Sequence, residues 1–129
     1  MARDTQKLAD ALRAGGDTAT VIPMHGFHYD DAVLDRLGLR ARKGSPATFD
    51  AAGFKALLQR LKACEPDVAI PHFDRALELS RAAAELVSAD VKFLVIEGNY
   101  LLLEEAPWAS LRPLFDMTVY LNVPVEELD

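Results

Sequence analysis

The strongest constraint on the fold is a pair of short, almost uninterrupted apolar segments, TATVIPM (residues 18–24) and VKFLVI (residues 91–96). The first is rich in β-branched residues, and both run nearly continuously apolar, which predicts strands covered on both faces. Such strands belong to parallel sheets, whose crossover connections place helices on the two faces. The sequence therefore predicts an α/β fold with a mostly parallel sheet.

Helix signals fill the segments around these two strands, as an α/β fold requires. The clearest is residues 50–64, where Asp50 can act as N-cap and leucines recur with Phe54 at helical spacing. In chain order we expect a helix over 4–14 capped by Asp4, a strand over 18–24, a helix ending at Gly38, the helix over 50–64, an extended segment over 67–74, a helix over 75–87, a strand over 91–96, a short helix over 106–115, a strand over 116–123 and a helix from Pro124.

The composition excludes several classes of function. The net charge of −6 over 129 residues argues against a nucleic-acid-binding protein, which needs a basic face. Cys64 is the only cysteine, so neither an internal disulfide nor a cysteine metal cluster can form. No apolar run approaches the roughly 18 residues of a membrane span, and the first residues lack the apolar core of a secretory signal. We therefore expect a single cytoplasmic domain with no membrane partner.

A group of polar residues beside a glycine follows each apolar strand. HGFHYDD (residues 25–31) follows the first strand, and Glu97 with Gly98 follows the second. In open α/β sheets, ligands bind outside the carboxyl ends of the strands, and glycine lets the backbone approach them closely. Two interpretations of Glu97 stay open. It is either a carboxylate for a cation or a metal-bound water, or a cap for the next turn that pairs with a lysine.

Four ordered motifs carry a resemblance to a known family. They are P-M-x-G-F-H-Y-D-D, R-K-G-S-P-x-T-F-D, I-P-x-F-D-R and V-I-E-G-N-Y-L-L-L, and the resemblance covers residues 7–128. The chain resembles the P-loop kinases of the uridine kinase, pantothenate kinase and phosphoribulokinase group, in particular bacterial nucleoside or fructose kinase-like members. The resemblance implies a three-layer P-loop NTPase-type fold. It also implies transfer of the ATP γ-phosphate, with Mg²⁺, to a hydroxyl of a nucleoside, sugar or related metabolite.

The resemblance also implies roles for individual residues. His25 stands where the family usually has an aspartate that accepts the proton of the substrate hydroxyl, and Glu97 would lie near the magnesium ion. Residues 84–87 would form a short strand, against the helix expected from propensity. The other implied acceptor-binding residues are Phe27, His28 and Tyr29 in the pocket, Arg42 and Lys43 in a loop that approaches the substrate, and Phe73, Asp74 and Arg75 in a segment that closes over it.

The chain departs from the family in its phosphate-binding parts. The motif G-x-x-x-x-G-K-[ST], whose amides and lysine hold nucleotide phosphates, does not occur in these 129 residues. We therefore expect a single partial P-loop kinase-like domain over residues 1–129 that lacks the first strand, the arginine-bearing lid and the last strand. ATP binding and catalysis should then be weak or absent. The resemblance implies that the missing first strand lies at the centre of the sheet. Its loss would leave strand edges unpaired, which predicts low stability or self-association.

His25 is a second departure from the family. An imidazole can accept a proton as a carboxylate does, but it differs in charge, reach and metal preference. His25 is therefore either a working base or a substitution in an inactive protein. Three functions stay open: a small-molecule kinase, a non-catalytic binding or structural fragment of one, and a metal-binding protein that uses His25, His28 and His72.

Overall fold

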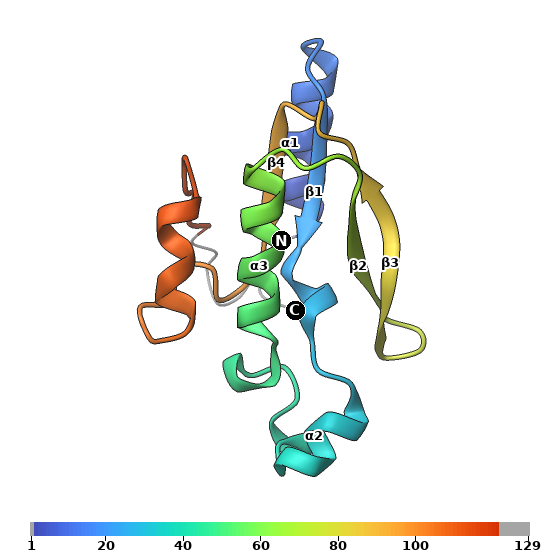
Figure 1. The fold of residues 1–129 in the computed structure, drawn as a ribbon, viewed down its shortest axis with the longest axis vertical. Coiled ribbons are helices and arrows are strands. Elements are labelled where there is room, and N and C mark those ends of the chain that lie inside the picture. Colours follow the sequence, from blue (N-terminus) through green and yellow to red (C-terminus); the bar gives the residue numbers. More distant parts are fainter. Residues whose placement is uncertain (1, 122–129) are drawn as a thin grey trace.

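The structure is a computed structural model that describes residues 2–121. The helices are α1 (Ala2–Ala14), α2 (Asp31–Leu37) and α3 (Ala51–Lys62), and the strands are β1 (Ala19–Pro23), β2 (Val68–Asp74), β3 (Leu79–Val87) and β4 (Phe93–Glu97). α1 and β1 come first along the chain, α2 and α3 follow, and the β2–β3 hairpin and β4 come after α3 (Figure 1). Short 3₁₀ segments cover Met24–Phe27, Arg40–Arg42, Pro46–Thr48 and Trp108–Leu114.

β1 and β4 form a parallel pair, although α2, α3 and the β2–β3 hairpin separate them in the sequence. Their register runs from Ala19 opposite Phe93 to Pro23 opposite Glu97. α3 lies on one face of this pair and α1 on the other, so both faces of the two apolar strands are covered (Figure 1). The predicted α/β fold, with parallel strands and helices on both faces, is confirmed.

The predicted helix over 75–87 is wrong. Most of this segment is β3, which pairs antiparallel with β2 and places Val68 opposite Val87. The alanine-rich sequence favours a helix locally, but helix propensity is a weak preference. Inter-strand hydrogen bonds and the burial of both valines in the core override it. The strand that the resemblance implied over 84–87 lies inside β3, and the extended segment expected over 67–74 is observed as β2.

The strand expected over 116–123 does not form in the part that the structure describes. Residues 116–121 have no regular secondary structure, and they expose large apolar side chains such as Tyr120. A strand needs a neighbour to pair with, and no described strand is placed beside this segment. Residues 122–123 and the helix expected from Pro124 lie outside the described residues.

The helix ends follow the predicted caps with one exception. The carboxylate of Asp50 accepts the Gly53 amide at 2.9 Å at the start of α3. Gly38 ends α2 in the left-handed conformation, with φ of 72°, as a C-terminal glycine does. α1, however, begins at Ala2, so Asp4 lies in its first turn and is not its N-cap. The short helix expected over 106–115 is the 3₁₀ segment Trp108–Leu114.

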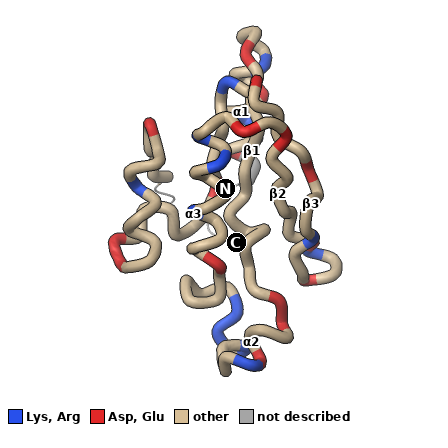
Figure 2. Tube along the Cα trace, viewed as in Figure 1, with Lys and Arg blue, Asp and Glu red and all other residues tan. Residues whose placement is uncertain are grey.

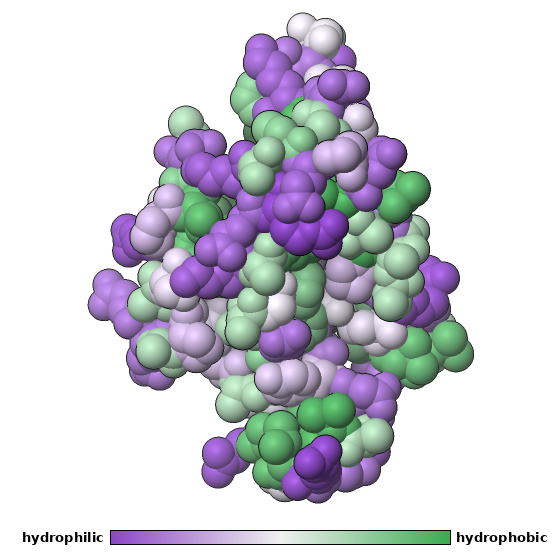
Figure 3. Space-filling view, viewed as in Figure 1, coloured by the Kyte–Doolittle hydropathy of each residue, from purple (hydrophilic) through white to green (hydrophobic). Residues whose placement is uncertain are grey.

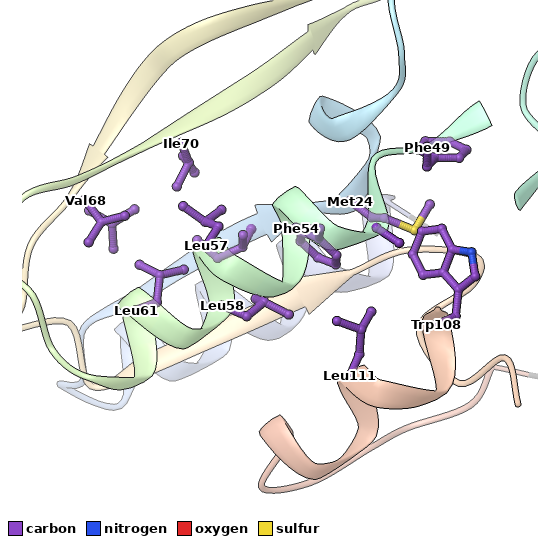
Figure 4. Packing of buried hydrophobic residues seen from close by; sticks show 13 residues of the cluster. Met24, Phe49, Phe54, Leu57, Leu58, Leu61, Val68, Ile70, Trp108 and Leu111 are labelled. Carbon is purple, nitrogen blue, oxygen red and sulfur yellow. The ribbon is translucent and has the colours of Figure 1, made fainter. Parts of the chain in front are cut away.

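The core lies between α3, the parallel strands and the hairpin. Figure 4 shows α3 presenting one row of apolar side chains to β1 and β2, which is the row that its helical spacing predicts. The 3₁₀ segment Trp108–Leu114 packs on α3 through Leu111, which is fully buried. The core members labelled in Figure 4 are Met24, Phe49, Phe54, Leu57, Leu58, Leu61, Val68, Ile70, Trp108 and Leu111.

The surface carries charges of both signs. Figure 2 shows basic and acidic residues close together around α2, where Arg40 contacts Asp35 at 3.1 Å and Asp31 at 3.7 Å. An apolar patch covers the same end of the molecule (Figure 3), and α2 contributes the exposed side chains of Val33 and Leu37 to it. None of the described helices is long and apolar enough to cross a membrane.

Candidate functional site

The parallel register brings the two polar strand ends together. Pro23 pairs with Glu97, so His25, two residues beyond β1, lies at the same edge of the sheet as the end of β4. The two glycines permit this close approach. A Cβ on Gly98 would lie 2.7 Å from the Met24 Cβ, and a Cβ on Gly26 would lie 2.6 Å from the main-chain oxygen of Pro71 in β2. The glycines therefore allow protein segments to approach one another.

A cleft of about 350 Å³ opens at this edge, between α1, the end of β1 and the β2–β3 hairpin. Five of the residues proposed from the sequence line it together: His25, His72, Phe73, Arg75 and Glu97. Residues of α1 complete the wall, and the hydroxyl of Thr5 donates a hydrogen bond to the carboxylate of Glu97. The cleft therefore combines an imidazole, a carboxylate, a guanidinium and an aromatic ring.

The His25 imidazole lies between two aromatic rings. Its ring centre is 5.3 Å from that of Phe73 and 5.6 Å from that of Phe49, both edge to face. Burial lowers the pKa of His25 below its ordinary value of 6.5, and the positive charge of Arg75 lowers it further. The carboxylate of Glu97 opposes this shift only in part. At neutral pH the ring is therefore uncharged and free to accept a proton.

The side chain of His28 is hydrogen-bonded to the main chain through both ring nitrogens. It is buried, and its Nδ1 lies 2.8 Å from the Tyr29 carbonyl oxygen. The amide of Gly44 donates to its Nε2 at 3.2 Å, which leaves Nδ1 as the ring nitrogen that can donate to Tyr29. Both nitrogens are thereby engaged within the protein. The sequence placed His28 in an acceptor pocket, whereas in the structure it anchors the loop that carries Arg42.

The loop between α2 and α3 is attached at Gly44 from two sides. Its amide binds His28, and its carbonyl oxygen accepts the Tyr100 hydroxyl at 2.6 Å. Lys43 contacts Asp31 at 2.9 Å, and this hydrogen bond raises the pKa of Lys43 and lowers that of Asp31.

The sequence analysis did not identify Tyr100 as a residue that positions this loop. The available signal was a tyrosine three residues after the strand end at Glu97.

Several proposed site residues lie away from the cleft. The ring of Phe27 packs on Phe54 in the core at 5.0 Å between centroids. Asp74 accepts the amide of Leu77 at 3.1 Å and contacts Arg81 at 3.7 Å, which stabilises the hairpin turn. The other proposed residues that do not line the cleft are His28, Tyr29, Arg42 and Lys43.

The side chains of the cleft determine which cations it could bind. Glu97 supplies a carboxylate in an open cleft, which suits the preference of Mg²⁺ for one or two protein carboxylates beside substrate oxygens. No three His, Cys, Asp or Glu residues within the described range 2–121 are grouped so that they could hold a metal ion. The ring centres of His25 and His28 are 6.5 Å apart, and both nitrogens of His28 are engaged. The metal-binding alternative therefore has no support.

Comparison with known proteins identifies relatives over most of the chain, although no family model matches it. The chain is 37% identical to a candidate uridine kinase of Schizosaccharomyces pombe over 116 residues, which cover 86% of this chain and 49% of that protein. It is 29% identical to a pantothenate kinase of Clavibacter sepedonicus over 125 residues, 94% of this chain and 39% of that protein. The chain thus spans about half the length, or less, of these curated relatives.

A solved kinase structure also matches most of the chain. The crystal structure of a candidate fructose transport system kinase from Silicibacter sp. TM1040 superposes with a TM-score of 0.88 at 42% identity. The superposition covers 93% of this chain and 58% of that one. The chain is therefore a relative of the P-loop kinases of the uridine kinase and pantothenate kinase type, and it shares their α/β fold.

Proposed function

We propose that residues 1–129 form one partial kinase domain whose cleft binds the acceptor of an ATP-dependent phosphoryl transfer. The acceptor is a small metabolite with a hydroxyl group, such as a nucleoside, a sugar or a pantothenate-like acid. The observation that carries this proposal is the meeting of His25 and Glu97 at adjacent strand ends in one cleft. The kinase names of the relatives support it.

In this proposal the cleft residues have separate tasks. The neutral His25 ring accepts a hydrogen bond from the acceptor hydroxyl and can take its proton. Phe49 and Phe73 pack edge to face against the imidazole, which also lines the cleft. Glu97 would hold Mg²⁺, which in kinases neutralises charge on the transferred phosphoryl group. The hydroxyl of Thr5 orients that carboxylate.

The residues present do not fit the phosphates of ATP. These 129 residues contain no G-x-x-x-x-G-K-[ST] loop, and that loop supplies the amides and the lysine that hold nucleotide phosphates in P-loop enzymes. On their own, the 129 residues are expected to bind an acceptor without phosphorylating it. The cytoplasmic location expected from the sequence stays a prediction.

Two titrations test this function. Uridine, D-fructose and pantothenate are each titrated into ¹⁵N-labelled protein, and we expect at least one to shift the imidazole signals of His25. His28 is an internal control in the same spectrum, because both of its nitrogens already have protein partners and it does not line the cleft. If none of the three compounds perturbs His25, acceptor binding in the cleft is refuted.

Calorimetry with ATP and Mg²⁺ is the second titration. We expect no measurable heat of binding, because the phosphate loop motif does not occur in these residues. Micromolar binding would contradict this part of the proposal, and it would show that other groups hold the nucleotide. A positive acceptor titration beside a negative ATP titration is the combination that the proposal requires.

A further inference from the structure

Arg75 is a cation of the cleft that has no carboxylate partner in the described part of the chain. The other basic groups of the cleft wall are already engaged. Arg13 donates to the Ala19 carbonyl oxygen at 2.7 Å and contacts Asp10 at 3.2 Å. His72 contacts Glu85 at 2.9 Å. In a chain with a net charge of −6, an arginine left without a carboxylate at a cleft is available for an anion from solution.

The backbone around Arg75 is held in place. It follows Asp74, whose carboxylate accepts the Leu77 amide at 3.1 Å within the hairpin turn. The far side of the turn is attached to the loop before α3, because Lys43 contacts the Glu78 carboxylate at 3.7 Å and its carbonyl oxygen at 3.4 Å. The main chain of Arg75 is therefore anchored, and only its exposed side chain has to be ordered when an anion binds.

The charges in the cleft are separated. Glu97 lies at the end of β4 with its carboxylate bound by Thr5, and Glu85 of β3 contacts His72 at 2.9 Å, whereas Arg75 lies in the turn between β2 and β3. Phe73 and the neutral His25 ring also line the cleft. An anionic group on the ligand is attracted to the Arg75 guanidinium and repelled from the carboxylates of Glu85 and Glu97. A hydroxyl on the same molecule can then reach His25.

From this arrangement, and resting on the proposed function, we infer that the acceptor carries an anionic group, a carboxylate or a phosphate, which binds the Arg75 guanidinium. The acceptor class is therefore a hydroxy acid, a sugar acid or a sugar phosphate. The guanidinium can bind either anion through two parallel hydrogen bonds. The charge of Arg75 also lowers the pKa of His25, so a bound anion offsets that effect and makes the imidazole a stronger base.

The test compares matched pairs of probes. D-gluconate and D-glucitol differ by a carboxylate, and D-fructose 6-phosphate and D-fructose differ by a phosphate. We expect the charged member of at least one pair to bind about 10- to 100-fold more tightly by calorimetry, as for hydrogen bonds to a charged group. It should also raise the pH midpoint of the His25 imidazole signal. The pair that shows the effect identifies carboxylate or phosphate.

Arg75→Gln should remove the preference for the charged member, so that the two members of the pair bind this variant with affinities within about twofold of each other. Arg81→Gln is the matched control, because Arg81 lies on the same hairpin but contacts Asp74, and this variant should keep the preference. Equal affinity within both pairs, or a preference that survives in Arg75→Gln, overturns the inference. If neutral members still shift His25 in that case, the proposed function stands. If no probe binds, both are refuted.

Discussion

Gly98→Ala adds one methyl group where the ends of β1 and β4 meet. The new Cβ would lie 2.7 Å from the Met24 Cβ and 2.8 Å from its Sδ, whereas carbon atoms in contact are about 3.5–4.0 Å apart. Met24 is fully buried, so it cannot turn into solvent. The strand ends must therefore separate by about 1 Å, or Met24 must leave its rotamer. Overpacking of this kind costs about 1–3 kcal/mol, and we expect the free energy of unfolding to fall by that amount.

Urea denaturation followed by the fluorescence of the buried Trp108 measures this loss. Gly15→Ala is the control, because its Cβ would find its nearest atom at an ordinary 3.5 Å, and it should change the free energy of unfolding by no more than about 0.5 kcal/mol. Met24→Ala makes room, so in the double variant Met24→Ala/Gly98→Ala the combined loss should be smaller than the sum of the single losses. Additive losses, or a Gly98→Ala protein as stable as the original, would refute the packing argument.

Three further predictions concern pH, the loop and the sheet edge. The folded pKa of His25 lies below its unfolded value of 6.5, so stability is complete above that pH and is lost as the pH falls through the folded pKa. His25→Gln should flatten the dependence of the unfolding free energy on pH below 6.5, and an unchanged slope in urea titrations would contradict this. Tyr100→Phe removes the hydroxyl that donates to the Gly44 carbonyl, so it should cost about 0.5–1.5 kcal/mol and speed amide exchange around Gly44, whereas native exchange rates would refute it. Within residues 2–121, β4 pairs only with β1, so its other edge has no strand beside it and we expect the protein to self-associate there. A monomer mass that stays constant at all concentrations in light scattering would contradict this expectation.

Local signals were sufficient for the parts of the fold that depend on short segments. The Asp50 cap and the apolar row placed α3 correctly, and the two apolar runs indicated a parallel pair before any register was known. The hairpin was not predictable in this way. The run of alanines before Val87 has the composition of a helix. That this segment pairs with β2 depends on the packing of Val68 and Val87 in one core with α3, which no local pattern shows.

The candidate site was predictable where it depends on strand order. His25 and Glu97 follow two parallel strands, and the carboxyl ends of such strands lie at one edge of the sheet. The position of His28 was not predictable, because its side chain binds Gly44, sixteen residues away along an irregular loop. Thr5 was equally hidden, since its contact with Glu97 depends on how α1 crosses the sheet.

The parallel pairing of β1 with β4 has a consequence for the order of folding. The hairpin and α3 form through contacts between near neighbours in the sequence, whereas the β1–β4 ladder must close a loop that contains α2, α3 and the hairpin. We expect this ladder to be absent from early folding species, and pulse-labelled amides of β4 should become protected after those of α3. His25 and Glu97 meet only through that ladder, so the cleft is assembled last, after the chain already has most of its helical structure.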